Sequence, residues 1–242
     1  MLHVFASFAE DILLNEERQE LKRQMGGPAF FIQNALGKMG SKFELTSSTP
    51  AQVELVMTNA GETHTKLVAK AAAFTPRFAD LSGKGVLIST TINEINLQGI
   101  EKFPGPAFID VQGYVRYPED SSQKRLWEEG SQLEAFCLKA TQAELAFLPP
   151  QLIERQKHKI LIVTKGSEGL DLYIQNKRHG IPVPNKIAGR DTIGAGDTLL
   201  ANFAARYLQT GNPLQSAEYA MNAVVEFLSE KPKLENLGLG KY

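Results

Sequence analysis

The stretch that decides the fold is Asp191-Thr192-Ile193-Gly194-Ala195-Gly196-Asp197-Thr198, which runs directly into an apolar segment. Apolar residues recur at helical spacing over 199–208, so we expect a helix to begin inside the motif. Gly194 and Gly196 allow successive backbone N–H groups to converge at the start of that helix, where they bind anionic oxygen. A carboxylate beside an anion is repelled by it. Asp197 is therefore expected to accept a proton from a hydroxyl group.

Two better-known phosphate-binding motifs do not fit this chain. It has no G-x-x-x-x-G-K-[ST], so it is not a P-loop protein. A dinucleotide-binding G-x-G-x-x-G needs a small residue where this chain has Leu199, and it would follow the first strand. A plain glycine-rich turn that caps a helix is the alternative. The combination of glycines, two carboxylates and a helix start favours a functional site.

The motif from Asp191 to Asp197 resembles the C-terminal signature of the ribokinase (PfkB) family of carbohydrate and nucleoside kinases. The resemblance implies that Asp197 is the catalytic base, which takes the proton of the substrate hydroxyl as it attacks the γ-phosphoryl group of ATP. It also implies that the amides of Gly194, Ala195 and Gly196 form the anion hole. Phosphoryl transfer requires mainly positioning and charge stabilisation. The anion-binding amides and the proton acceptor inferred above from the residues provide both.

Length and composition indicate a single domain over 1–242. With 242 residues and 43% hydrophobic content, the chain can bury one substantial core. The 26 basic and 27 acidic residues give a net charge of -1, which does not indicate a nucleic-acid or membrane surface. The single cysteine, Cys137, excludes an internal disulfide and lies among apolar residues. No apolar run approaches bilayer length and no signal peptide is evident, so we expect a cytoplasmic protein.

The N-terminal segment predicts a buried strand over Leu2 to Phe8. Asp11 lies just past its end, where open α/β sheets gather their ligands. The resemblance implies that Asp11 binds substrate hydroxyls, whereas an exposed acid in a loop is the alternative. The charged run from Asn15 to Gln24 predicts a solvated helical or irregular segment. The family usually has strands of a β lid here, and the short gap predicts a reduced lid.

Gly26-Gly27-Pro28-Ala29 predicts the start of a helix that ends at Gly40. It resembles the N-terminal signature of the family, whose glycines let the backbone approach the sugar. Gly26 and Gly27 are therefore implied to bind substrate, and an ordinary helix start is the alternative. Phe31 replaces an asparagine that commonly contacts sugar hydroxyls, which argues for a less polar or differently oriented substrate.

A hairpin is predicted within 43–70, where 53–58 and 63–68 have the pattern of two strands joined by a turn. This hairpin would supply what remains of the lid, or it would be an edge through which a homodimer forms. The sequence leaves both open.

From Gly85 onward the pattern alternates between strands and helices. Near-continuous apolar segments indicate a parallel sheet covered by helices on both faces. These segments are 86–89, 107–111, 135–138 and 160–164. Together with the resemblance, they predict a three-layer α/β fold of the ribokinase type, with a mostly parallel central sheet and a reduced β lid. Asn93-Glu94 and Asp110-Val111-Gln112-Gly113 follow strand ends, so they are expected at the rim of the site.

The segment from Lys139 to Glu144 resembles the N-x-x-E motif of the family, with Thr141 in place of the asparagine. The glutamate of that motif helps to organise magnesium and phosphate through water, so Glu144 is the implied magnesium residue. Magnesium prefers oxygen ligands and keeps several waters. A helix that begins at Thr141, with Glu144 completing a capping box, is a compatible alternative.

The remaining resemblances concern ATP. The turn from Val163 to Leu170 is similar to a threonine-x-glycine turn that lies along the nucleotide phosphates, although a lone lysine in a turn is often simply exposed. The helix predicted from Pro213 resembles the element that holds the adenine. The implied ATP-binding residues are Thr164, Lys165, Gly166, Gly169 and Asn222.

The resemblance as a whole implies an ATP- and Mg²⁺-dependent kinase that phosphorylates a hydroxyl of a sugar, nucleoside or similar alcohol. It also implies a monovalent cation near Asp191, although Ile193 replaces a common threonine. The implied substrate-binding residues are Asp11, Gly26, Gly27 and Asp191. A non-catalytic nucleotide-binding regulatory protein is one alternative, favoured by the short lid, Phe31 and Thr141, but such a protein has no need for the base. A kinase that acts on a vitamin precursor is another alternative.

Overall fold

The main sheet has eight strands and is mostly parallel, as predicted. The structure, a computed structural model, describes residues 1–58, 61–117, 123–185, 187 and 190–233. The strands lie in the order β12-β11-β10-β9-β8-β7-β1-β4. All pairs from β4 to β10 are parallel, and β11 and β12 add an antiparallel edge. Their bounds are β1 Leu2–Ala6, β4 Phe43–Thr46, β7 Gly85–Ser89, β8 Ala107–Asp110, β9 Cys137–Thr141, β10 Ile160–Thr164, β11 Leu170–Ile174 and β12 Lys177–Ile181.

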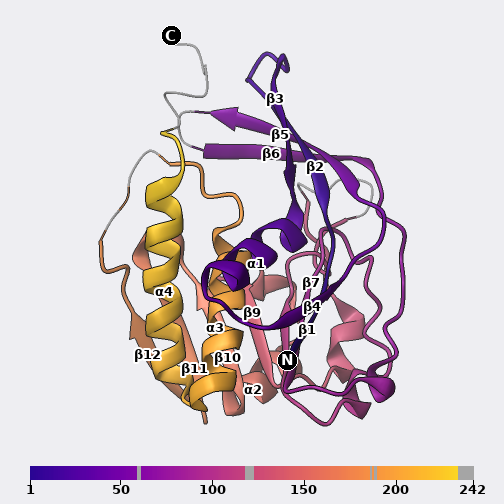
Figure 1. Cartoon of the computed structure of the whole chain (residues 1–242), viewed down its shortest axis with the longest axis vertical. Helices are drawn as coiled ribbons and strands as arrows, with labels where there is room; N and C mark the ends of the chain where they lie inside the picture. Colours follow the sequence, from indigo (N-terminus) through magenta and orange to yellow (C-terminus); the bar gives the residue numbers. More distant parts are fainter. Residues whose placement is uncertain (59–60, 118–122, 186, 188–189, 234–242) are drawn as a thin grey trace.

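Both faces of this sheet are apolar, because successive residues of a strand point to opposite sides. In β1, for example, Val4 packs on one face and Phe5 on the other. Three helices cover the first face (Figure 1): α1 Gly27–Lys38, α3 Ala195–Thr210 and α4 Pro213–Glu230. The second face is covered by α2 (Pro150–His158) and by irregular segments.

The second face has fewer helices than the alternating pattern predicts. The connections after β7 and β8 contain the short 3₁₀ turns Ile100–Lys102 and Glu128–Gln132. The first connection includes glycines and prolines within 99–106, and both residue types disfavour helix interiors. Aromatic side chains fill the space instead. The buried rings of Tyr114 and Trp127 stack with their centroids 4.7 Å apart.

A second sheet of four strands, in the order β3-β2-β5-β6, forms the lid. Figure 1 shows it at the top of the molecule, at the end where α4 finishes. Its strands are β2 Ala9–Leu14, β3 Glu20–Gly26, β5 Ala51–Thr58 and β6 Gly61–Ala69. Strands β5 and β6 confirm the predicted hairpin, and positions 59–60 of its turn lie outside the described residues.

The interpretation of the charged run from Asn15 to Gln24 was wrong in its second half. Residues 20–26 form β3, which pairs antiparallel with β2 and sets Ala9 opposite Gly26. Strand β3 is an edge strand, where charged side chains discourage pairing with other chains. The pairing also places Asp11 inside β2 and not in a loop after the first strand. The lid therefore has two strands more than the predicted hairpin.

The helices that follow the two glycine motifs are confirmed. Helix α1 begins at Gly27 with a proline in its first turn, and α3 begins at Ala195 with Gly194 as its N-cap. Strand β9 begins at Cys137, two residues later than predicted, and this cysteine is buried as expected. None of the helices in the described ranges is long and apolar enough to cross a membrane.

Candidate active site

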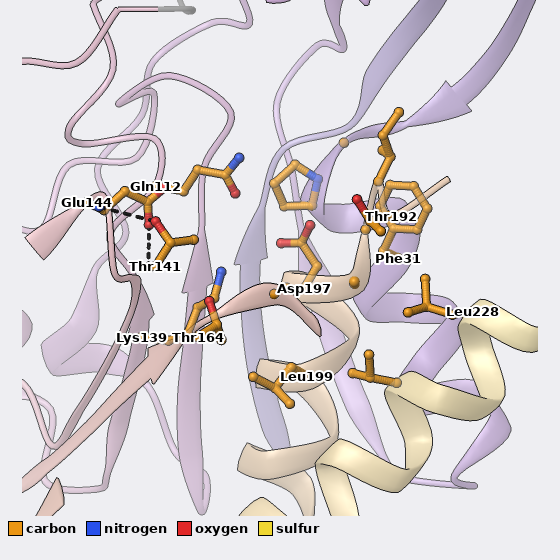
Figure 2. Close-up of a pocket in the computed structure, with 18 of the residues that line it drawn as sticks. Phe31, Gln112, Lys139, Thr141, Glu144, Thr164, Thr192, Asp197, Leu199 and Leu228 are labelled. Carbon is orange, nitrogen blue, oxygen red and sulfur yellow. Dashed lines mark hydrogen bonds between the residues drawn. The ribbon is translucent and has the colours of Figure 1, made fainter. Parts of the chain in front are cut away.

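A cavity of about 470 Å³ lies where the carboxyl ends of the main-sheet strands meet the lid. Its walls come from β2 and β5 of the lid, from the N-termini of α1 and α3, and from α4. Figure 2 shows Asp197 near the centre, with Lys139 on one side and Phe31 and Leu228 on the other. The predicted site residues that line the cavity are Asp11, Gly27, Glu144, Thr164, Gly166, Gly169, Gly194, Ala195, Gly196 and Asp197.

The glycines of the motif allow the start of α3 to approach two side chains closely. Gly194 has a φ of 83°, and a Cβ at this position would lie 2.3 Å from the ring of Phe31. A Cβ at Gly196 would lie 2.5 Å from Lys139 Nζ. Neither position has space for a side chain. The positive end of α3 is therefore brought directly to the cavity wall, where an anion would bind.

The amide of Ala195 has a different role from the one predicted. Its N–H donates to Thr192 O at 3.0 Å and closes the turn before the helix. The first helical bond runs from Thr198 N–H to Gly194 O at 2.9 Å. Because the first amides of an α-helix have no intrahelical acceptor, the structure points to the N–H groups of Gly196 and Asp197 as the anion donors.

Asp197 is buried in the first turn of α3, and its Oδ1 accepts a hydrogen bond from Ser89 Oγ at 2.9 Å. Burial and the nearby charge of Asp110 raise the pKa of Asp197 to about 6, while Lys139, the Ser89 hydrogen bond and Arg116 act in the opposite direction. A carboxylate with a pKa near neutrality in a cavity is well suited to accept a proton.

The activity of the enzyme is expected to fall as the pH drops through about 6, because Asp197 must be deprotonated to act as a base. Ser89→Ala removes a hydrogen bond that favours the charged form, so it should shift the acidic limb of the kcat/KM profile to higher pH. Ser229→Ala, an exposed serine of α4, is the matched control. Coincident profiles for the wild type and Ser89→Ala would show that the acidic limb belongs to another group.

Lys139 is a functional candidate to which the sequence analysis assigned no role. It is buried in β9, and its Nζ donates to Asp110 Oδ2 at 2.7 Å. Burial acts to lower the pKa of Lys139, but Asp110, Glu144 and Asp197 outweigh it, so the pKa is raised and the side chain is a fixed cation. The sequence did contain a sign of this role, because Lys139 lies inside a largely apolar strand and buried lysines are rare.

Thr141 and Glu144 form the reciprocal pair of a capping box. Thr141 N–H donates to Glu144 Oε2 at 2.8 Å, and Glu144 N–H donates to Thr141 Oγ1 at 3.2 Å. The predicted helix start at this point was wrong, because a 3₁₀ turn at Leu145–Phe147 follows and α2 begins at Pro150. Glu144 is buried and lines the cavity. Within the described ranges, no cluster of three or more His, Cys, Asp or Glu side chains could hold a metal by itself.

The two glycines at the start of α1 are explained by close contacts, of Gly26 with Asp11 and of Gly27 with the backbone of residues 7–9. A Cβ at Gly26 would lie 1.9 Å from Asp11 Oδ2, and Gly27 has a φ of 76° with a Cβ position only 2.6 Å from Ala9 N. Asp11 is buried and lines the cavity. The glycines therefore let this carboxylate lie directly against the backbone at the start of α1.

Further polar side chains reach the cavity from the loops after β7 and β8. Gln112 lines the cavity, and its N–H donates to Asp110 Oδ1 at 3.0 Å. Arg116 also lines it and donates to Thr91 O at 3.4 Å. Glu94 holds the first loop by accepting the N–H of Thr91 at 2.6 Å. Gln112 thus lies at the predicted rim, Glu94 holds the loop without lining the cavity, and Arg116 was missed.

Two predicted ATP-binding residues, Lys165 and Asn222, are not part of the cavity lining. Lys165 Nζ forms an ion pair with Asp171 Oδ1 at 2.9 Å. Asn222 is exposed on α4, and its Nδ2 donates to Glu218 O at 3.1 Å. Its neighbour Met221 lines the cavity instead. Adjacent residues of a helix point in directions about 100° apart. The sequence did not reveal which side of α4 faces the cavity, so it could not distinguish Asn222 from Met221.

Asp191, predicted to bind substrate, lies behind the anion hole. Its Oδ1 accepts the N–H of Ile193 at 2.8 Å, and its Oδ2 accepts a hydrogen bond from Lys231 Nζ at 2.6 Å. The hydrogen bonds of this carboxylate therefore stabilise the turn that leads into α3.

One end of the cavity is apolar. Its walls come from the segment after β12 and from the inner side of α4, next to the start of α3. The residues are Val183, Ile187, Leu199, Met221, Val224, Val225 and Leu228. Such a slot beside an anion site is suited to a flat, largely apolar ring.

Sequence comparison supports what this geometry indicates. A model of the pfkB family carbohydrate kinases matches residues 128–226, which include Lys139, the glycine motif and most of α4. This part of the chain is similar to the PfkB family. The predicted family and the prediction of a carbohydrate kinase are thus confirmed. No curated protein matches the chain by sequence.

Solved structures of ribokinase-family kinases share the fold of this chain. A pyrophosphate-dependent kinase solved with a pyrophosphate analogue and myo-inositol has a TM-score of 0.76 at 17% identity, over 97% of both chains. The nucleoside kinase of Methanocaldococcus jannaschii has a TM-score of 0.73 at 16% identity, over 98% of this chain and 96% of that chain. Ribokinase of Arabidopsis thaliana, solved with ribose and ATP, has a TM-score of 0.69 at 17% identity, over 97% of this chain and 94% of that chain. The predicted ribokinase fold is confirmed.

Proposed function

We propose that this PfkB kinase transfers the γ-phosphoryl group of ATP to a hydroxyl group of a small sugar-like or nucleoside-like alcohol. The observation that carries the proposal is the position of Asp197, which is buried at the start of α3 and next to Gly196, where Lys139 Nζ approaches the backbone. A proton acceptor, a fixed cation and a positive helix end thus meet at one cavity. These are the groups that phosphoryl transfer requires.

The proposed reaction uses these groups in one displacement. Asp197 accepts the proton of the acceptor hydroxyl as its oxygen forms a bond to the γ-phosphorus. The bond from that phosphorus to the β–γ bridging oxygen breaks, and ADP leaves. The amides of the first turn of α3 and the ammonium of Lys139 stabilise the negative charge on the phosphoryl oxygens.

The acceptor would bind between the lid and the start of α1. Asp11, Gln112 and Arg116 provide polar groups for hydroxyl oxygens on this side of the cavity. Phe31 lines the cavity, and its ring also packs where a Cβ of Gly194 would otherwise lie. The polar groups of Asp11, Gln112 and Arg116 favour the sugar-like acceptor over the vitamin precursor.

ATP is favoured as the donor by the apolar end of the cavity. A purine ring could lie against Met221, Val224 and Val225, next to the anion hole, whereas inorganic pyrophosphate has no group that would use such a surface. The pyrophosphate-dependent kinase with the same fold makes pyrophosphate the donor to test against ATP.

Magnesium would arrive with the phosphates of ATP and neutralise part of their charge. The described residues fit this arrangement, because the buried carboxylate of Glu144 lines the cavity together with Lys139. A hard cation that keeps most of its waters needs few protein ligands.

The test is phosphoryl transfer from MgATP, and separately from magnesium pyrophosphate, to a panel of sugars, cyclic polyols, nucleosides and pyrimidine or pyridoxal alcohols. Acceptor-dependent ADP release would support the proposal, and product analysis would identify the hydroxyl. Transfer from pyrophosphate alone would overturn the choice of donor. If no acceptor stimulates turnover while ATP raises the melting temperature, the protein is a nucleotide-binding regulator. A homodimer and a cytoplasmic location stay predictions from the sequence.

A further inference from the structure

The end of α4 places a lysine directly behind the anion hole. Lys231 caps α4, and its Nζ donates to Asp191 Oδ2 and to Ile193 O, both at 2.6 Å. The ammonium also lies 5.5 Å from the ring centroid of Phe31 and 5.1 Å from that of Phe227. The side chain is only 13% exposed. A carboxylate, a carbonyl oxygen and two aromatic faces therefore replace most of the water around this cation.

These contacts hold the turn that forms the anion hole. Asp191 Oδ1 accepts the N–H of Ile193, and Thr192 O accepts the N–H of Ala195, so the turn is closed from both sides. Gly194 follows in a left-handed conformation, and the anion-binding amides come next. Lys231 Nζ donates hydrogen bonds to two oxygen atoms of this turn, Asp191 Oδ2 and Ile193 O. A shift of the ammonium would therefore move the amides that hold the phosphoryl group.

A free monovalent cation does not fit beside Asp191. Such an ion would need the oxygen atoms of the turn as ligands, and both Asp191 Oδ2 and Ile193 O are hydrogen-bonded to Lys231. The ammonium already supplies one positive charge at that place. Burial lowers the pKa of Lys231, and the charge of Asp191 acts against that effect.

We propose that Lys231 is a tethered cation that positions the anion hole in place of a free monovalent ion, so that turnover does not depend on K⁺ or Na⁺. Lys231 is a positioning residue, because it acts through Asp191 and Ile193 and does not line the cavity. The proposal rests on the proposed kinase function for its kinetic readout.

The experiment measures kcat and KM for MgATP in chlorides of K⁺, Na⁺, NH₄⁺ and choline at constant ionic strength. The wild type should turn over equally in all four salts. Lys231→Ala should lose about 10²-fold in kcat in choline, because the anion-hole donors are displaced. NH₄⁺ or K⁺ should restore part of that loss by entering the vacated space. Lys231→Arg, which keeps the charge, should retain more activity than Lys231→Met.

Lys38→Met is the matched control. Its Nζ contacts Glu230 at the same end of α4, but both side chains are exposed and neither lines the cavity. This variant should keep the kcat of the wild type. A lysine with only a structural role would lower the melting temperature of the Lys231 variants without salt-specific rescue of kcat.

Two results would overturn the inference: a wild type whose turnover requires K⁺ or Na⁺, or a Lys231→Ala variant with unchanged kcat in choline. The wild-type salt series decides even when a variant fails to fold. If the wild type transfers phosphate to no acceptor, the proposed function fails separately. The inference is then tested by measuring pyrophosphate binding with calorimetry. Lys231→Ala should bind pyrophosphate more weakly than the wild type in choline chloride, and K⁺ should restore its affinity. Equal affinity of the variant in both salts would refute the inference.

Discussion

Asp197→Asn is expected to lower kcat by about 10³-fold, while KM for both substrates changes little. Asparagine has nearly the same shape and can keep the contact with Ser89, but it cannot take the proton of the acceptor hydroxyl. Because the base acts only as the new bond forms, its loss affects the transition state more than substrate binding. Steady-state rates of acceptor-dependent ADP release measure both constants.

The stability of this variant separates catalysis from folding. Burial raises the pKa of Asp197 above its ordinary value of 3.8 to about 6, so its ionised form costs folding free energy near neutral pH. A neutral asparagine removes that cost, and the melting temperature should be unchanged or higher. Asp80→Asn, at an exposed aspartate, is the control for the substitution. Retention of turnover within about tenfold in Asp197→Asn would assign the base to another residue.

Lys139→Met is expected to reduce both activity and stability. The change leaves Asp110 buried and without its ammonium partner, which costs about 3–5 kcal/mol of unfolding free energy. It also removes the cation beside Gly196, so kcat should fall by about 10²-fold. The acidic limb of the pH profile should move to higher pH, because Lys139 holds the pKa of Asp197 down. Urea unfolding and kcat/KM profiles measure these effects.

A double variant distinguishes the two roles of Lys139. Asp110→Asn combined with Lys139→Met removes both charges of the buried pair, so much of the lost stability should return. Turnover should stay low, because the phosphoryl group still lacks the cation. If turnover returns together with stability in the double variant, Lys139 has only a structural role.

Features decided by neighbouring residues were predictable. The glycines of the 191–198 motif and the apolar spacing after them located the start of α3, because one left-handed residue and one amphipathic pattern are local properties. The same holds for α1, which follows Gly26. The apolar runs of the central strands indicated a parallel sheet because both of their faces are buried.

Features decided by distant partners were missed. The charged residues of β3 form a strand because β2 offers them backbone hydrogen bonds, and nothing in their composition indicates this. Lys165 was assigned to ATP, but Asp171 of the neighbouring strand holds its ammonium. Asn222 was preferred to Met221 because the packing of α4, which sets the rotation of the helix, was not known.

The sequence by itself indicated the ribokinase fold, the parallel sheet and the two helix starts with their glycines, and it singled out Asp197 as the candidate base. Only the tertiary structure decided which cationic side chains lie near this carboxylate and the start of α3. Lys139, Arg116 and Lys231 come from a strand, a loop and the end of a helix far from the motif in the chain. The reason is that the role of a charge depends on burial and on the opposite charge that it faces, and both are fixed by contacts between segments remote in sequence.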